Sequence, residues 1–62
     1  MWSYEHNRWK RDDGWLVYLD RTGRWMADKP TGEMLRDGEG KVRRFGDPEA
    51  GKEFVDKVYR SK

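Results

Sequence analysis

Residues 15–28 read WLVYLDRTGRWMAD, and they predict a β-hairpin around which the rest of the fold is arranged. Two apolar runs flank Asp20-Arg21-Thr22-Gly23, where an aspartate at the first position and a glycine at the fourth are typical of a tight turn. Alternate side chains of a strand point to opposite sides, and within residues 15–19 both sets are apolar. This first strand is therefore expected at the centre of a sheet.

Glycine-containing turns at short spacing extend this pattern over residues 1–46 and favour an antiparallel meander. Asp-Asp-Gly at 12–14 predicts a turn before the hairpin, and residues 41–45 predict a last strand that ends at Gly46. Between them, Met34-Leu35 is either a short strand or a loop segment over the core. Residues 1–9 are either an extra edge strand or a frayed arm. We expect three or four strands, with the meander spanning 15–46.

The spacing of apolar residues changes near the C-terminus from that of strands to that of a helix, and it predicts a helix over residues 48–60. Asp47 is a good N-cap and Pro48 suits the first helical position. The apolar positions that follow fall on one stripe: Ala50, Phe54, Val55, Val58 and Tyr59. We expect this stripe to pack on Val17, Leu19 and at least one of Trp15 and Trp25. The predicted fold is a small α+β domain, an antiparallel meander packed against one helix, with 1–62 as a single domain.

Composition narrows the possible functions. The chain has 62 residues and no cysteine, so a disulfide framework, a thiolate zinc site and a nucleophilic thiol are excluded. Its longest apolar run, at 15–19, is far shorter than the roughly 20 residues of a membrane helix. These features favour a cytoplasmic protein that has no membrane partner.

Catalytic chemistry has little support in this sequence. The single histidine, His6, has no cysteine or second histidine to form a metal site or a nucleophile and its base. No glycine-rich phosphate loop is present, and so short a chain lacks walls for a substrate pocket. We expect no enzyme, no cofactor, no metal site and no small-molecule substrate.

Arginines and aromatic residues are interleaved along the predicted sheet. Four arginines lie on adjacent strands and turns, among Trp15, Tyr18 and Trp25: Arg21, Arg24, Arg43 and Arg44. Guanidinium groups beside flat rings suit phosphates and base edges, and they equally suit an acidic protein partner. The net charge of +2 does not by itself predict nucleic-acid binding.

Three passages carry a resemblance to a known group of domains: Gly23-Arg24-Trp25-Met26-Ala27, the segment GKVRRFGD at 40–47, and Ala50 with Phe54 and Tyr59. Over residues 15–60 the chain resembles the Apetala/ethylene-response-factor DNA-binding domains and the arm-binding domains of phage tyrosine recombinases. The resemblance implies a three-stranded sheet backed by one helix, with the sheet entering the major groove. It also implies a phage or mobile-element origin.

The resemblance and the basic side chains of this region together predict a set of nucleic-acid contacts. Arg24 and Trp25 would contact DNA from the middle strand, and Arg43 or Arg44 from the last. The whole expected set is Arg21, Arg24, Trp25, Lys41, Arg43 and Arg44. The predicted function is a small module that binds nucleic acid, most simply duplex DNA, through the exposed sheet face.

A second function fits the same residues. Four tryptophans in so short a chain are well above ordinary usage, and tryptophan is a common anchor at protein interfaces. The alternative is a small protein-binding or inhibitor module, anchored by exposed tryptophans with basic residues at the rim.

Overall fold

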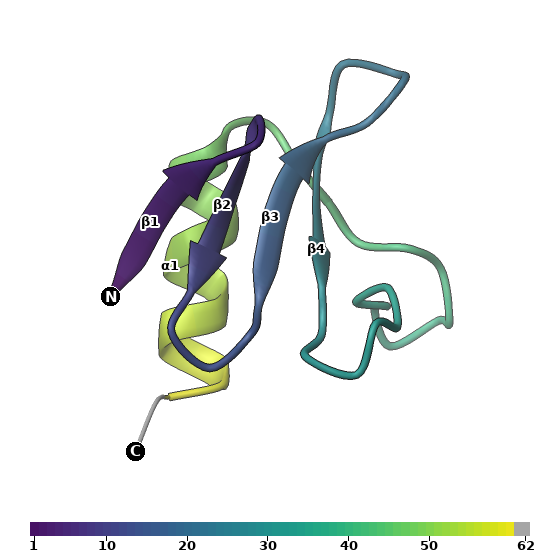
Figure 1. The fold of residues 1–62 in the computed structure, drawn as a ribbon. Helices are drawn as coiled ribbons and strands as arrows, with labels where there is room; N and C mark the ends of the chain where they lie inside the picture. The colour runs from purple at the N-terminus through teal and green to yellow at the C-terminus, as the bar shows by residue number, and fades with distance from the viewer. Residues whose placement is uncertain (61–62) are drawn as a thin grey trace.

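The structure, a computed structural model, describes residues 1–60 (Figure 1). One helix follows five strands: β1 (Trp2–Glu5), β2 (Arg8–Arg11), β3 (Leu16–Leu19), β4 (Trp25–Asp28), β5 (Arg44–Phe45) and α1 (Pro48–Val58). The strands form one antiparallel sheet in the order β1-β2-β3-β4-β5. The predicted α+β meander with a C-terminal helix is confirmed.

The expected number of strands, three or four, is wrong, because the first eleven residues add a complete hairpin. Trp2 pairs with Arg11 and Glu5 with Arg8, which leaves two residues for the turn. These are His6 and Asn7, with φ values of 52° and 62°, as in the tight turns whose twist matches that of a hairpin. Residues 2–5 therefore form an edge strand rather than a frayed arm.

The central hairpin, β3 with β4, has the arrangement that residues 15–28 predict. Val17 lies opposite Ala27 and Leu16 opposite Asp28. In the turn, the Asp20 carboxylate accepts hydrogen bonds from the backbone N–H groups of Thr22 and Arg24, at 2.8 and 3.1 Å. The turn therefore supplies its own hydrogen bonds, as aspartate turns commonly do.

The last predicted strand, 41–45, is reduced to the two residues of β5. Residues 34–36 come between this segment and β4, because Met34 bridges to Asp28 and Val42 bridges to Arg36. Between the two bridges, Leu35 is only 2% exposed and belongs to the core. Residues 34–36 therefore act mainly as a loop segment that covers the core, with one bridge on each side.

Helix α1 begins as the sequence predicts and ends at Val58, two residues before the expected end. The Asp47 carboxylate accepts a hydrogen bond from the Ala50 N–H at 2.7 Å, and Pro48 occupies the first turn. At the other end, the buried Arg11 guanidinium donates to the carbonyl oxygens of Val55 and Tyr59. The Val55 carbonyl also accepts the Tyr59 N–H at 2.8 Å, so the β2 side chain adds a second donor there and supplies a donor to the Tyr59 carbonyl beyond the last turn.

The core lies between the sheet and α1, and its buried members are Trp15, Val17, Ala27, Leu35 and Val55. The helix comes closest at Gly51, where a Cβ atom would lie 3.2 Å from Val17 and 3.3 Å from Phe45. Two residues expected in this contact are about half exposed, Leu19 (52%) and Val58 (53%). Leu19 is the last residue of β3, and at the C-terminal end of the helix it is the Tyr59 ring that packs on Trp15, with ring centres 4.7 Å apart.

Across the described part of the chain, no helix is both long and apolar enough to span a membrane.

Candidate functional site

The helix packs on only one side of the sheet; on the other side Met26 is 7% exposed and the remaining strand residues are partly or fully exposed. In Figure 1, α1 lies behind the strands. The pairing register and the alternation of side chains place nine strand residues on the side away from it: Ser3, Glu5, Arg8, Lys10, Leu16, Tyr18, Met26, Asp28 and Arg44. We call this surface the open side.

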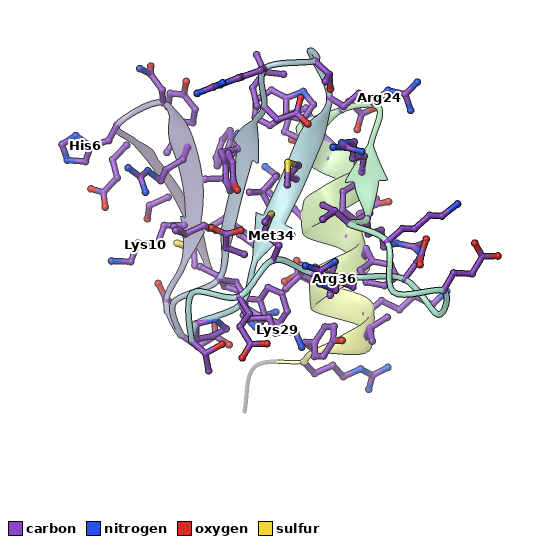
Figure 2. The ribbon with its side chains drawn as sticks, turned by 90° about the vertical axis from the view of Figure 1, so that its right-hand side faces the viewer. His6, Lys10, Arg24, Lys29, Met34 and Arg36 are labelled. Carbon is purple, nitrogen blue, oxygen red and sulfur yellow. The ribbon has the colours of Figure 1, made fainter. Side chains whose placement is uncertain are left out.

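Basic side chains from several elements lie on the open side. Arg8 and Lys10 come from β2, and both are exposed. Arg24 precedes β4 and has the parity of Met26; in Figure 2, which views the sheet from its side, Arg24 lies at the upper right and Lys10 at the left. Among residues 1–60, no carboxylate lies within 4 Å of the charged groups of Arg8, Lys10 or Arg24. In the part of the chain that the structure describes, none of these three charges is held in an ion pair, although Arg8 is near enough to Asp28 for its charge to act on that carboxyl.

Asp20, in the β3–β4 turn, is held by groups of the protein itself. Its carboxylate accepts hydrogen bonds from the Thr22 hydroxyl at 2.6 Å and from the Arg44 Nε at 3.1 Å. The hydrogen bond from the Thr22 side chain, followed by those from the Arg24 backbone and Arg44, lowers the pKa of Asp20 to about 2. Asp20 is thus ionised at neutral pH and neutralises part of the charge of Arg44.

Asp28 occupies a different environment, in the middle of the open side. The Tyr18 hydroxyl donates a hydrogen bond to its Oδ1 at 3.1 Å. Burial raises the pKa of Asp28, although the Tyr18 hydrogen bond and the charge of Arg8 partly oppose this shift. A hollow of about 320 Å³ adjoins these groups, and its lining is His6, Asn7, Arg8, Tyr18, Leu19 and Asp28.

A second hollow, of about 480 Å³, lies on the other flank of Arg8. Its lining includes Lys10, Leu16 and Pro30. Arg8 borders both hollows and is therefore the central basic side chain of this surface.

The structure brings together only part of the contact set predicted from the sequence. Arg24 and Arg44 both adjoin Asp20, through a backbone N–H and a side-chain Nε respectively. Arg21 is exposed in the same turn. These three arginines lie around one end of the central hairpin.

The other predicted contacts lie elsewhere, so the structure does not bring the six residues together on one surface. Trp25 points to the helix side and packs against the core. The Arg43 guanidinium carbon lies 4.3 Å from the centre of the Phe54 ring, also on that side. Lys41 is in an exposed turn, 3.8 Å from Glu39. The cause is alternation, because Trp25 and Arg43 have the opposite parity to Arg24 and Arg44.

The tryptophans are likewise on the helix side. Trp15 and Trp25 both pack in the core, where at least one of them was expected, and neither lies among the arginines of the open side. Trp15 is 4% exposed, and the other three are partly buried against the core: Trp2, Trp9 and Trp25. A chain with three leucines and no isoleucine uses its indole rings to fill the core. None of them belongs to the open side.

Sequence reasoning missed the side chains at the centre of the open side. Arg8, Lys10 and Asp28 were absent from the predicted set. The sequence does contain a pattern that indicates them, since Trp9 lies between Arg8 and Lys10. An apolar residue between two basic ones indicates a strand with one buried and one solvent-exposed side. Uncertainty about residues 1–9 concealed it.

Within residues 1–60 there is no group of three or more histidine, aspartate or glutamate side chains placed to hold a metal ion. No protein-family model, curated protein or solved structure matches this chain in the comparisons made.

Proposed function

We propose that this protein binds nucleic acid, specifically duplex DNA, through the open side of its sheet. The observation that carries the proposal is the one-sided cover. With α1 on one side, the other side presents Arg8 and Lys10 with Arg24 at its margin, and no acidic group of the described chain pairs with them. Lysine and arginine side chains on one surface are what phosphate contacts require.

The state of the acidic residues supports this proposal. Asp20 is bound by Arg44 and Thr22, so it presents little free charge to a phosphate. Asp28 is partly buried beneath the Tyr18 hydroxyl. With Asp20 set against Arg44, the cations Arg8, Lys10 and Arg24 face two carboxylates, Glu5 and Asp28, so the open side and its margin keep a net positive charge.

The resemblance noted in the sequence supports the same function. In the resembled domains, three strands and a helix follow one another, and the free side of the sheet enters the major groove. Here β3, β4, β5 and α1 follow one another in the same order, and β1 and β2 widen the sheet by one hairpin.

A titration of fluorescently labelled duplex DNA at two salt concentrations tests the proposal. With about three phosphate contacts, the slope of log K against log salt is about −2.7, so affinity should fall about 40-fold between about 50 and 200 mM salt. An affinity that does not change with salt would contradict phosphate contacts and favour a protein partner.

Matched variants locate the binding surface. Arg8→Ala combined with Lys10→Ala removes two of the three charges and leaves one phosphate contact. The affinity of this double variant should therefore fall only about 3- to 4-fold over the same salt range. Lys57→Ala combined with Arg60→Ala removes two exposed charges from the helix and its end. That control pair should keep the wild-type salt slope. An equal effect of both pairs would show that net charge, rather than the open side, governs binding.

A further inference from the structure

One group on the open side does not fit phosphate binding. Asp28 bears a negative charge near the centre of a surface whose other free charges are basic, apart from Glu5 on the edge strand β1. It repels a phosphate, and burial already makes its ionised form costly. A carboxylate in that position is stabilised by a ligand only if the ligand donates a hydrogen bond to it.

The local geometry leaves Asp28 able to accept such a bond. The Tyr18 hydroxyl donates to Oδ1 at 3.1 Å and fixes the orientation of the carboxylate. Within residues 1–60, no group donates a hydrogen bond to Oδ2. Asp28 also lines the hollow of about 320 Å³ beside β3, so a ligand seated there reaches it.

Arg8 completes the arrangement. It lies directly opposite Tyr18 in the β2–β3 pair, and it lines the same hollow as Asp28. No ion pair joins the two side chains, so the Arg8 guanidinium keeps its donors. A fork of donors and an acceptor thus border the same hollow.

We infer that Arg8 and Asp28 together read one G·C base pair in the major groove; this inference rests on the proposed function. Cytosine N4 and adenine N6 are the amino donors that a major groove offers to a carboxylate. Only the G·C pair adds two acceptors on the partner base, O6 and N7 of guanine, which suit a guanidinium. Arg8 comes from β2, outside the strands that carry the family resemblance, so this site is particular to the present chain.

Tyr18 is a positioning residue in this site. Its hydroxyl holds Oδ1, so Oδ2 remains for the base. Tyr18→Phe should keep the sheet and lose part of the base preference, because the carboxylate is then free to turn.

The test compares two labelled duplexes of equal length, one of alternating G·C and one of alternating A·T pairs, at one salt concentration. Wild-type protein should prefer the G·C duplex by about 10-fold, within the range of one good bidentate contact. Asp28→Asn should remove or invert this preference, because an asparagine amide pairs with adenine. A melt followed by tryptophan fluorescence confirms that the variant folds, since the amide oxygen can still accept from Tyr18.

Glu5→Gln is the matched control, because Glu5 is another carboxylate of the open side. It should raise affinity for both duplexes by the same factor and leave their ratio unchanged. If Asp28→Asn behaves like Glu5→Gln, Asp28 acts only through its charge, and the base-reading inference is overturned while DNA binding stands. If the wild type binds neither duplex at low salt, the proposed function fails, and the inference fails with it.

Discussion

Arg11 joins three parts of the molecule through one buried guanidinium. It forms ion pairs with Asp13 at 2.6 Å and Asp56 at 3.0 Å, and it donates to carbonyl oxygens at the end of α1. The side chain is 2% exposed. A buried charge is stable only when it is paired and hydrogen-bonded, so β2, the following turn and the helix end are fixed relative to one another.

Arg11→Met should therefore lower the free energy of unfolding by about 3 kcal/mol, because the carbonyl groups and both carboxylates lose a charged donor. Urea denaturation at neutral pH measures the change. Arg8→Met, on the same strand but exposed on the open side, should change stability by no more than about 0.5 kcal/mol. Equal effects of the two substitutions would show that the ion pairs of Arg11 contribute nothing.

Asp20 makes the free energy of unfolding depend on pH in the acid range. Its pKa is about 2 in the folded protein and 3.8 when unperturbed. The unfolded chain therefore takes up the proton first, and the stability that Asp20 contributes is complete above about pH 4 and is lost as the pH falls towards 2. Between pH 5 and pH 2.5, the urea midpoint of the wild type should fall.

Asp20→Asn should reduce that fall without abolishing it, because Arg11 also lowers the pKa of Asp13 and that group titrates in the same direction. Glu53→Gln, on the exposed side of the helix, should show the full wild-type fall. An acid dependence that is unchanged in Asp20→Asn would contradict the role given to the turn.

Helix α1 docks through its smallest residue. At Gly51 the helix backbone approaches Val17 and Phe45 so closely that even a methyl group would lie 3.2 to 3.3 Å from them. An 11-residue helix is marginal alone, so its stability comes from this contact and from the burial of Val55.

Gly51→Leu should consequently destabilise the protein by about 3 kcal/mol, since the side chain must push the helix off the sheet. Glu53→Leu places the same residue on the exposed side of α1 and should cost about 0.5 kcal/mol or less. Thermal unfolding followed by circular dichroism compares the two. A Gly51→Leu protein as stable as Glu53→Leu would mean that the helix does not dock as described.

The elements that local signals mark strongly were predictable from the sequence. Asp47-Pro48 marks the start of the helix, and the Asp20-Gly23 turn marks the central hairpin. The N-terminal hairpin was predicted only as one of two alternatives, because its turn uses His6 and Asn7 at positive φ instead of a glycine. The shortening of the last strand depends on which partner Val42 pairs with, and that choice is made by tertiary contacts.

At the level of the whole molecule, one helix covers one side of a five-stranded sheet. This arrangement separates the side chains by role. The indole rings pack in or against the core, and the cationic side chains of Arg8 and Lys10 on β2 lie on the open side. The sequence predicted the exposed sheet face but mixed its two sides, because it treated Arg43 and Trp25 as neighbours of Arg44 and Arg24. The side of the sheet on which a residue lies depends on the strand register. The register could not be assigned from the sequence, because the pairing partners of each strand were not known.

Nuclear magnetic resonance of the side chains can show directly which side of the sheet meets DNA. On addition of duplex at low salt, the Nε–H signals of Arg8 and Arg44 should shift, while the indole N–H signals of the four tryptophans stay in place. Arg43, stacked on Phe54, serves as the internal control and should also stay. Shifts of Trp25, Trp9 and Arg43 with Arg8 unmoved would place the ligand on the helix side and contradict the assignment of the open side as the binding surface.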